Sequence, residues 1–311
     1  MKSIRISKNE DGITLIKYLR KIFKSMPSSL IQKLVRKKYF DINDKRAKGD
    51  EILKNDDIVT IHLADETFEK YFEENDIQKN ETTVDIDYTE RIIYEDDNII
   101  IFNKPVGLLS QGDKSGSQSV NTLLNKYIGN INSSFKPSVV NRLDRNTEGL
   151  IIFAKTYIAA KAISNMVKEN RVEKRYKASV NGLVKEDSGE LENIYKKNEK
   201  DNKAILKDYK GKVPDGYSLV KLKYKVLKWY KETTDLDIEL ITGKSHQIRA
   251  QFAYIGHPLL SDKKYMDINL YNANVKKYGF KSQSLVCYKI KFGTFVEDNL
   301  KNLSNKTFKI W

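Results

Sequence analysis

Apolar and polar residues alternate with two different periods along this chain, and the first 65 residues carry the helical one. Within residues 15–22 the apolar side chains follow the i, i+3, i+4, i+7 spacing of an amphipathic helix. Ser29 with Gln32 three positions later is a capping-box pattern, which predicts that a second helix begins there. Residues 39–42 and 51–63 predict short extended segments.

Strand-like runs dominate from residue 89 onward. They cover residues 92–94, 99–102, 150–153, 176–180, 219–227 and 236–240. Helical patterns interrupt them at 157–169 and 247–254, whereas the polar stretch 185–217 predicts an excursion over the surface. This mixture predicts an α+β fold: a mixed, mainly antiparallel sheet with packed helices, plus a small α+β amino-terminal domain.

Acidic residues mark the boundary between the two regions. Residues 66–98 hold twelve Asp and Glu against three Lys and Arg, with little apolar periodicity. Such a composition is typical of a linker. We therefore expect domains at 1–65 and 89–311, joined by an acidic linker at 66–88. The length of 311 residues fits two domains of about 150 residues each.

The chain is basic, because 56 Lys and Arg against 42 Asp and Glu give a formal net charge of +14. Eleven of the basic residues lie between Lys17 and Lys48, a stretch that contains only two acidic residues, Asp41 and Asp44. This excess favours a polyanionic partner such as RNA, although a solvated helix face has the same charge pattern. The single cysteine, Cys287, excludes an internal disulfide and is typical of a reducing cytoplasm. Apolar runs fall far short of the roughly 20 residues that cross a bilayer, so we expect no membrane segment.

Three polar segments border apolar strands and are candidates for a functional site. Lys104 ends an apolar run just before a Pro-Val-Gly turn, where its ammonium can contact phosphate. Asp144 is flanked by two arginines, and nearby cations favour the ionised carboxylate, which can act as a nucleophile. If a helix begins at Ser245, Arg249 lies one turn further on the same side and can reach a carboxylate outside the helix. Taken singly, each segment is also explained by a tight turn, a structural ion pair or a helix cap.

Two motif-like segments fail on their spacing. A calcium loop starting at Asp144 needs a carboxylate at its twelfth position, which is Lys155. Gly243, Lys244 and Ser245 match the end of a phosphate-binding loop, but the upstream position that requires glycine is occupied by Ile238. With one cysteine and three histidines the chain also lacks a set of ligands for structural zinc. We expect neither a metal nor a nucleotide cofactor.

Four segments, taken together and in this order, resemble the signature of the RluA-type pseudouridine synthases. They are Asn103-Lys104-Pro105-x-Gly107, Arg142-Leu143-Asp144-Arg145-x-Thr147-x-Gly149-Leu150, Lys174-Arg175-Tyr176, and Thr242-Gly243-Lys244-x-His246-Gln247-Ile248-Arg249 with Gly256-His257-Pro258. The resemblance covers residues 89–311. Residues 15–50 resemble the RNA-binding module first described in ribosomal protein S-four. The pairing points to the branch that modifies large-subunit ribosomal RNA.

The resemblance implies an isomerase without a cofactor that converts specific uridines of RNA to pseudouridine. Asp144 would be the catalytic nucleophile or general base at the target ribose. Tyr176 would pack against the uracil and assist proton transfer, and Arg249 would pair with Asp144 and aim it. The base must leave its stack to reach such a site, at a cost of a few kcal/mol. Which atom Asp144 attacks first stays open.

Contacts with the RNA are expected from a second group of residues. They are Arg142, Lys104, His246 and Gln247 at the site, and Lys33, Arg36 and Lys37 on the S-four-like module. An obligate protein partner is not evident. Two positions depart from the family pattern: Asn141 stands where histidine is usual, and Glu148 where a small hydroxyl residue is usual. Neither departure removes the carboxylate.

Two other functions stay open at this level. A non-catalytic RNA-binding protein would keep the scaffold and use the basic module alone. A basic hydrolase with paired carboxylates would need a second acidic residue beside Asp144, and Glu148 is the near candidate in the sequence.

Overall fold

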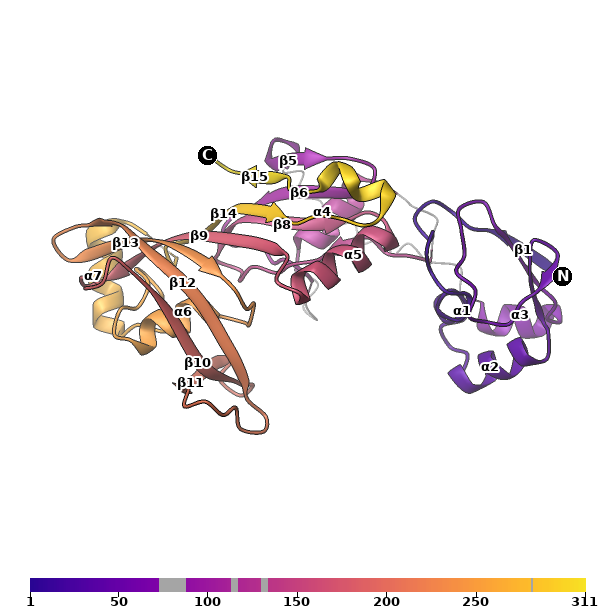
Figure 1. Ribbon diagram of the computed structural model, residues 1–311, viewed down its shortest axis with the longest axis horizontal. Coiled ribbons are helices and arrows are strands. Elements are labelled where there is room, and N and C mark those ends of the chain that lie inside the picture. Colours follow the sequence, from indigo (N-terminus) through magenta and orange to yellow (C-terminus); the bar gives the residue numbers. More distant parts are fainter. Residues whose placement is uncertain (73–87, 113–116, 130–133, 281) are drawn as a thin grey trace.

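Two β-sheets organise the chain, and Figure 1 shows the smaller one at the amino-terminal end of the molecule. The computed structural model describes residues 1–72, 88–112, 117–129, 134–280 and 282–311. Within these residues, no helix is long and apolar enough to cross a membrane.

The amino-terminal part is a four-stranded antiparallel sheet with the order β1-β4-β2-β3. Its elements are β1 (Lys2–Arg5), α1 (Leu15–Ile22), α2 (Ser28–Arg36), β2 (Phe40–Ile42), β3 (Lys45–Arg46), β4 (Ile58–Ile61) and α3 (Asp65–Tyr71). Both predicted helices are confirmed. The predicted capping box at Ser29 is wrong. The helix α2 begins at Ser28, directly after Pro27, and no side chain caps it. Asn43 and Asp44 have positive φ angles of 48° and 62°, as a two-residue hairpin turn requires.

The acidic stretch expected to be a linker begins as a helix. Phe68 on α3 is buried, stacks on Phe72 at 4.5 Å between ring centroids, and meets Phe23 edge-on at 5.8 Å. The packing of these aromatic rings stabilises the helix in spite of its acidic sequence. The remainder of the expected linker, residues 73–87, lies outside the described residues.

Among the described residues, the larger sheet has eleven strands, nine of them in the order β11-β10-β12-β13-β9-β14-β8-β6-β5, with β15 beside β14 and β7 beside β8. The strands are β5 (Ile92–Glu95), β6 (Ile99–Lys104), β7 (Ser138–Val139), β8 (Glu148–Ala154), β9 (Val172–Asn181), β10 (Ser188–Asn198), β11 (Lys203–Asp208), β12 (Ser218–Trp229), β13 (Thr233–Leu240), β14 (Leu285–Phe292) and β15 (Thr307–Lys309). β14 and β8 run parallel and the other named pairs run antiparallel. The predicted mixed, mainly antiparallel sheet is therefore confirmed.

The stretch 185–217, expected to be a surface excursion, instead contains two strands. β10 and β11 form a hairpin, and β10 also pairs with β12. The sequence pattern missed them because most of their side chains are polar and face solvent, while Ile194 and Tyr195 provide the buried contacts.

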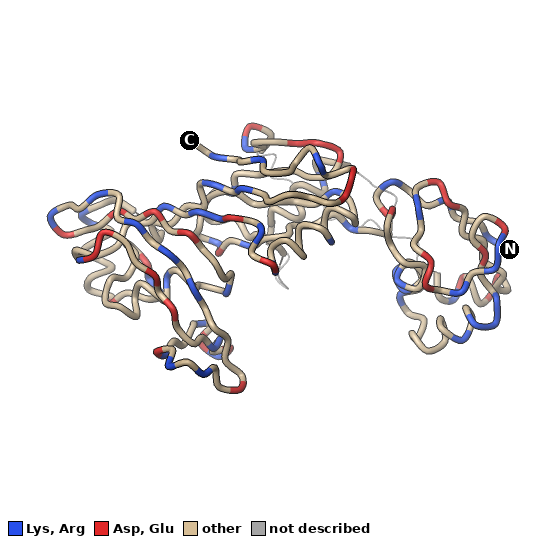
Figure 2. The backbone as a smooth tube through the Cα atoms, viewed as in Figure 1, with Lys and Arg blue, Asp and Glu red and all other residues tan. Residues whose placement is uncertain are grey.

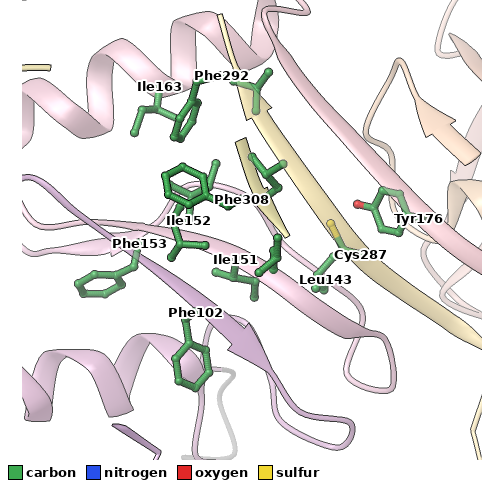
Figure 3. Packing of buried hydrophobic residues seen from close by; sticks show 14 of the residues in the cluster. Phe102, Leu143, Ile151, Ile152, Phe153, Ile163, Tyr176, Cys287, Phe292 and Phe308 are labelled. Atoms are coloured by element: carbon green, nitrogen blue, oxygen red, sulfur yellow. The ribbon is translucent and has the colours of Figure 1, made fainter. Parts of the chain in front are cut away.

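Helices and short 3-10 turns pack around the larger sheet. They are η1 (Thr89–Arg91), α4 (Val120–Tyr127), α5 (Tyr157–Lys168), α6 (Gln247–Tyr254), α7 (Ile268–Tyr278) and η2 (Asp298–Leu303). Figure 1 shows α6 and α7 beside the β10–β13 end and α4 and α5 beside the other. Figure 3 shows part of the core, in which Ile152 and Phe308 lie on one side of β8, whereas Phe102 and Phe153 lie on the other. The two predicted helices of this part, now α5 and α6, are confirmed.

Contacts also join the amino-terminal part to the rest. Glu10 is buried and accepts a hydrogen bond from the backbone N–H of Ser134 at 2.6 Å. The ammonium of Lys21 lies over the rings of Phe135 and Tyr157, at 5.0 and 5.5 Å from their centroids. These contacts place α1 against the start of α5.

Candidate active site

A loop between β7 and β8 presents Asp144, and neighbouring segments hold this loop in place. Asn141 is buried and bridges to β8, because its Nδ2 donates to the Leu150 carbonyl and its Oδ1 accepts from the Ile152 N–H. The Ser110 hydroxyl donates to the carbonyl of Leu143 at 2.7 Å and accepts from its N–H at 2.9 Å. Asn141 therefore supports the loop that carries Asp144.

Gly149 allows β8 to approach β14 closely just after this loop. Its φ angle is +120°, and a Cβ at this position would collide with the backbone of Cys287. Because L side chains rarely adopt such a φ angle, glycine is required here. The parallel pairing of the two strands, which brings Asp144 toward Tyr176, depends on it.

Arg249 on α6 joins two carboxylates. Its Nη1 lies 2.8 Å from Oδ2 of Asp144, while Nε and Nη2 form a bidentate pair with Asp262, both at 2.7 Å. The side chain of Asp262 is fully buried and that of Arg249 is 8% exposed, whereas that of Asp144 is 23% exposed. Asp262 thus fixes the guanidinium, and the guanidinium directs Asp144 toward solvent-accessible space.

The charges of this group favour an ionised arginine. Burial acts against the cation, but hydrogen bonding and charge interaction with Asp262, followed by Asp144, raise the pKa of Arg249 above its ordinary value. The expected pairing of Arg249 with Asp144 is present in the structure. Asp262 was not identified from the sequence, because no local pattern shows which carboxylate a distant arginine will meet.

Tyr176 on β9 is 4% exposed and stands opposite the buried Cys287 of β14, with which it pairs across the two strands. Figure 3 shows the two side chains facing each other from the neighbouring strands. Burial raises the pKa of Tyr176 well above 10 and that of Cys287 to about 12, so both groups stay neutral. The site therefore offers a neutral phenol and an unreactive thiol.

A hollow of about 680 Å³ brings these groups together. Asp144, Tyr176 and Arg249 line it, together with Arg142 and Lys174. A second hollow of about 450 Å³ also borders Asp144 and Arg249. Volumes of this size suit a small organic group such as a nucleoside.

His246 and Gln247 stand at the start of α6, which has the bounds predicted for this helix, 247–254, and does not begin at the alternative position Ser245. His246 has a left-handed φ of 56°, and its Nδ1 lies 3.1 Å from the Tyr265 hydroxyl while its Nε2 lies 3.9 Å from Asp144. Gln247 is buried and its Nε2 donates to the Lys221 carbonyl. Both line the larger hollow, but Gln247 is held by backbone.

Lys104 takes a different place from the expected contact with phosphate. It is fully buried, and its Nζ donates to three carbonyls, those of Pro105, Leu108 and Arg145, each at 2.9 Å. Burial lowers the pKa of Lys104 to about 8, while Asp144 acts in the opposite direction. All three donors are used within the described residues, which leaves none for the expected phosphate contact, and the ammonium instead braces the loop that carries Asp144.

The other predicted RNA contacts are exposed. Arg142 lies at the rim of the larger hollow. Lys33, Arg36 and Lys37 are exposed along α2, and Figure 2 shows basic residues recurring in this part of the chain. The structure does not bring these three into the site around Asp144.

The carboxylate that a hydrolase would need is directed elsewhere. Glu148 lies 3.8 Å from Arg91 and lines neither hollow. In the described part of the chain, no group of three or more His, Cys, Asp or Glu is arranged to hold a metal ion.

Comparison with known proteins gives a consistent picture. A family model described as RNA pseudouridylate synthase matches residues 98–254. Ribosomal large subunit pseudouridine synthase C of Rickettsia bellii is 34% identical over 261 residues, 81% of this chain and 82% of the relative. An uncharacterized RNA pseudouridine synthase of Aquifex aeolicus is 32% identical over 279 residues, 87% and 78% of the two chains.

Solved structures agree at the level of the fold. Human RNA pseudouridylate synthase domain containing 4 superposes with a TM-score of 0.56 at 19% identity, covering 72% of this chain and 89% of that one. For human RNA pseudouridylate synthase domain containing 1 the TM-score is 0.53 at 18% identity, with 66% and 79% covered. The resemblance expected from the motifs is thereby confirmed for the catalytic part, and this chain belongs to the RNA pseudouridylate synthase family.

Proposed function

We propose that this protein isomerises specific uridines of large-subunit ribosomal RNA, with Asp144 as the catalytic carboxylate. The observation that carries the proposal is the 2.8 Å pair between Arg249 and Asp144 at the wall of a hollow that Tyr176 also lines. The guanidinium pairs with the carboxylate and restricts its direction, so that an extruded nucleoside meets a positioned carboxylate.

Each member of the site has a distinct part in this proposal. Asp144 acts at the ribose of the target uridine, either as a nucleophile or as a base. Tyr176 presents its ring to the uracil, and stacking of a base on an aromatic ring is worth about 1 to 3 kcal/mol. Arg142 and His246 border the nucleotide at the rim, where they help to hold it.

The reaction needs no external redox or phosphoryl chemistry. One carbon–nitrogen bond is broken, the base turns, and one carbon–carbon bond is formed, so the atoms of substrate and product are the same. We accordingly assign the chemistry to side chains alone, without a cofactor. We also propose that the enzyme needs no obligate protein partner.

Large-subunit ribosomal RNA is favoured as the substrate by the relatives, several of which are named ribosomal large subunit pseudouridine synthase C. Residues 1–65 are proposed to act as an S-four-like RNA-binding domain, supported by the exposed cations Lys33, Arg36 and Lys37 on α2. Residues 89–311 would be the catalytic domain, with 66–88 between them. We propose that the reaction takes place in the cytoplasm, because the proposed substrate is ribosomal RNA.

The first experiment incubates the purified full chain with large-subunit ribosomal RNA and measures pseudouridine by mass spectrometry of nuclease digests. The wild type and a Glu148→Gln control should form pseudouridine at similar rates, because Glu148 lies outside both hollows. Asp144→Asn should reduce the product to background while RNA affinity is retained. Product formation by Asp144→Asn at the wild-type rate would overturn the assignment.

A second experiment tests the substrate. Pseudouridine is mapped in the ribosomal and transfer RNA of cells with and without the gene for this chain. We expect sites in large-subunit ribosomal RNA to disappear. If every site persisted while the protein still bound the RNA, a non-catalytic RNA-binding role would be favoured instead.

A further inference from the structure

Lys174 lies on β9 two residues before Tyr176 and is 6% exposed. Because successive side chains of a strand point to opposite faces, Lys174 and Tyr176 project from the same face of the sheet. The burial pattern of β9 alternates accordingly, with both residues on the buried side. Both line the larger hollow, together with Asp144.

The ammonium of Lys174 differs from the other two buried cations of the site, which both have hydrogen-bond partners. Lys104 donates to three carbonyls, and Arg249 contacts two carboxylates. For Lys174, no hydrogen bond or ion pair is present within the described residues. Burial lowers the pKa of Lys174, and the thiol of Cys287 opposes this in part.

An unpaired buried cation is costly, and such groups are concentrated at functional sites. The ammonium lies beside the backbone of Gly243, since a Cβ at this glycine would be in ordinary van der Waals contact with Nζ of Lys174, at 3.8 Å. The charged and titratable groups that share the hollow with Lys174 include Asp144, Tyr176, Lys244 and Arg249.

Depth within the hollow distinguishes two possible contacts of the ammonium with a nucleotide. Phosphates stay near solvent, where the exposed Arg142 and Lys244 at the same hollow can reach them. Lys174 is buried beside Tyr176, the residue proposed to pack on uracil. Its position therefore favours a contact with the base.

We propose that Lys174 donates a hydrogen bond to an exocyclic oxygen of the extruded uracil and stabilises the negative charge of the base while it is detached from the ribose. This inference rests on the proposed site at Asp144. It adds a catalytic group that acts on the leaving base, whereas Asp144 acts on the sugar.

The bonding changes show why such a cation is needed. Cleavage of the C1′–N1 bond leaves its electron pair on the base, as a uracil anion with charge on N1, O2 and O4. The ribose is satisfied by a bond to the Asp144 carboxylate or by loss of its C2′ proton. When C5 then bonds to C1′, C5 releases a proton, N1 gains one, and the sugar regains its original state. A preorganised donor at the developing anion lowers the barrier of the cleavage step.

The symmetry of uracil allows one lysine to serve both orientations of the base. A half-turn about the line through N3 and C6 exchanges N1 with C5, and it also exchanges O2 with O4. An ammonium that contacts one exocyclic oxygen before the turn therefore meets the other one afterwards. Lys174 needs no movement to hold the anion throughout the rearrangement.

The test compares Lys174→Met, Lys174→Gln and a matched control, Lys197→Met, which removes an exposed cation from the same hollow. Full-length proteins are mixed in excess with large-subunit ribosomal RNA, and the single-turnover rate and the RNA dissociation constant are measured separately. We expect the rate of Lys174→Met to fall about 100-fold, the effect of losing one preorganised donor. Lys174→Gln should fall less, and affinity should stay within about twofold of wild type.

A substrate change isolates the charge on the base. RNA transcribed with 5-fluorouridine carries a base whose anion is intrinsically more stable. The defect of Lys174→Met in cleaving the C1′–N1 bond should shrink at least about fivefold on this RNA, because less stabilisation is needed from the protein. An unchanged defect would overturn the role on the leaving base.

Other outcomes are equally decisive. Loss of RNA affinity with a weaker dependence on salt would assign Lys174 to a phosphate, against the proposal. Removal of an unpaired buried charge should leave thermal stability equal or higher, so unfolding of both variants would make Lys174 structural and overturn it. Wild-type rates in both variants would also overturn it. Failure of the wild type itself to form pseudouridine would instead reject the proposed function.

Discussion

Positive charge is used in opposite ways at the catalytic site and on α2. The Arg249 side chain is 8% exposed and is held between two carboxylates, so its charge has a fixed position and direction. Lys33, Arg36 and Lys37 are exposed to solvent, where salt screens them and their side chains move freely. Under the proposed function, the buried cation would organise the chemistry, whereas the exposed ones would supply affinity for RNA.

The largest expected effect comes from removing the buried cation. Arg249→Met leaves Asp144 and Asp262 without their shared partner, and breaking a buried ion pair in this way costs about 3–5 kcal/mol of stability. The single-turnover rate should fall on the order of 1,000-fold, as for loss of a principal electrostatic group. Urea unfolding and pseudouridine formation measure the two losses. A stable variant with normal activity would remove the basis of the comparison.

A smaller effect is expected from Asp262→Asn, which tests whether Arg249 must be oriented from behind. The amide cannot accept both hydrogen bonds from the guanidinium. By analogy with residues that orient a metal ligand, activity should fall about 10- to 100-fold. The RNA dissociation constant should not change, since Asp262 is fully buried. Reduced affinity with a normal single-turnover rate would contradict this positioning role.

Charge removal on α2 should have the reverse signature. In the triple variant Lys33→Gln, Arg36→Gln, Lys37→Gln, RNA affinity should fall and the slope of log affinity against log salt should decrease by about 2, given roughly 0.7 to 0.9 per lost phosphate contact. The single-turnover rate at saturating protein should not change. Lys161→Gln with Lys168→Gln on α5 serves as a control for the loss of exposed helix charge. An unaltered salt slope in the triple variant would separate α2 from RNA binding.

The smallest expected effect concerns the pH dependence of the site. Burial and then Arg249 lower the pKa of His246 from 6.5, whereas Asp144 acts in the opposite direction. The unfolded chain therefore binds this proton more readily than the folded one. The contribution of His246 to the stability of the protein is fully present above pH 6.5 and is lost as the pH falls below that value toward the folded pKa. Between pH 7 and 5, the melting temperature of His246→Gln should fall less than that of the wild type. Equal losses would show that another group is responsible.

The catalytic centre was predictable from sequence to the extent that its chemistry is carried by a motif. Asp144 and Arg249, 105 residues apart, were expected to meet and do so at 2.8 Å. Their third partner, Asp262, was beyond prediction because its bidentate contact depends on the path of the chain after α6. The expectation for Lys104 failed for a related reason. A lysine at the end of a strand can contact phosphate only if its ammonium does not already donate to carbonyls, and the sequence does not show those carbonyls.

The fold was predictable where side chains alternate clearly between core and solvent. β9, whose residues are buried at every second position, was recognised in part from 176–180. β10 was missed because most of its side chains are polar, and its place is set by backbone pairing with β11 and β12. The start of α2 was misplaced because Pro27 determines it, not the pattern at Ser29. Pairing and backbone constraints are thus the information that periodicity lacks.

The central claim is best tested with ribosomal RNA labelled with tritium at C5 of uridine, because formation of the new carbon–carbon bond releases this hydrogen to water. The wild-type chain should release one tritium for each pseudouridine formed and no free uracil, and Asp144→Asn should release none above background. Release by Asp144→Asn at the wild-type rate, or label recovered as free uracil, would contradict an isomerase that depends on the carboxylate paired with Arg249.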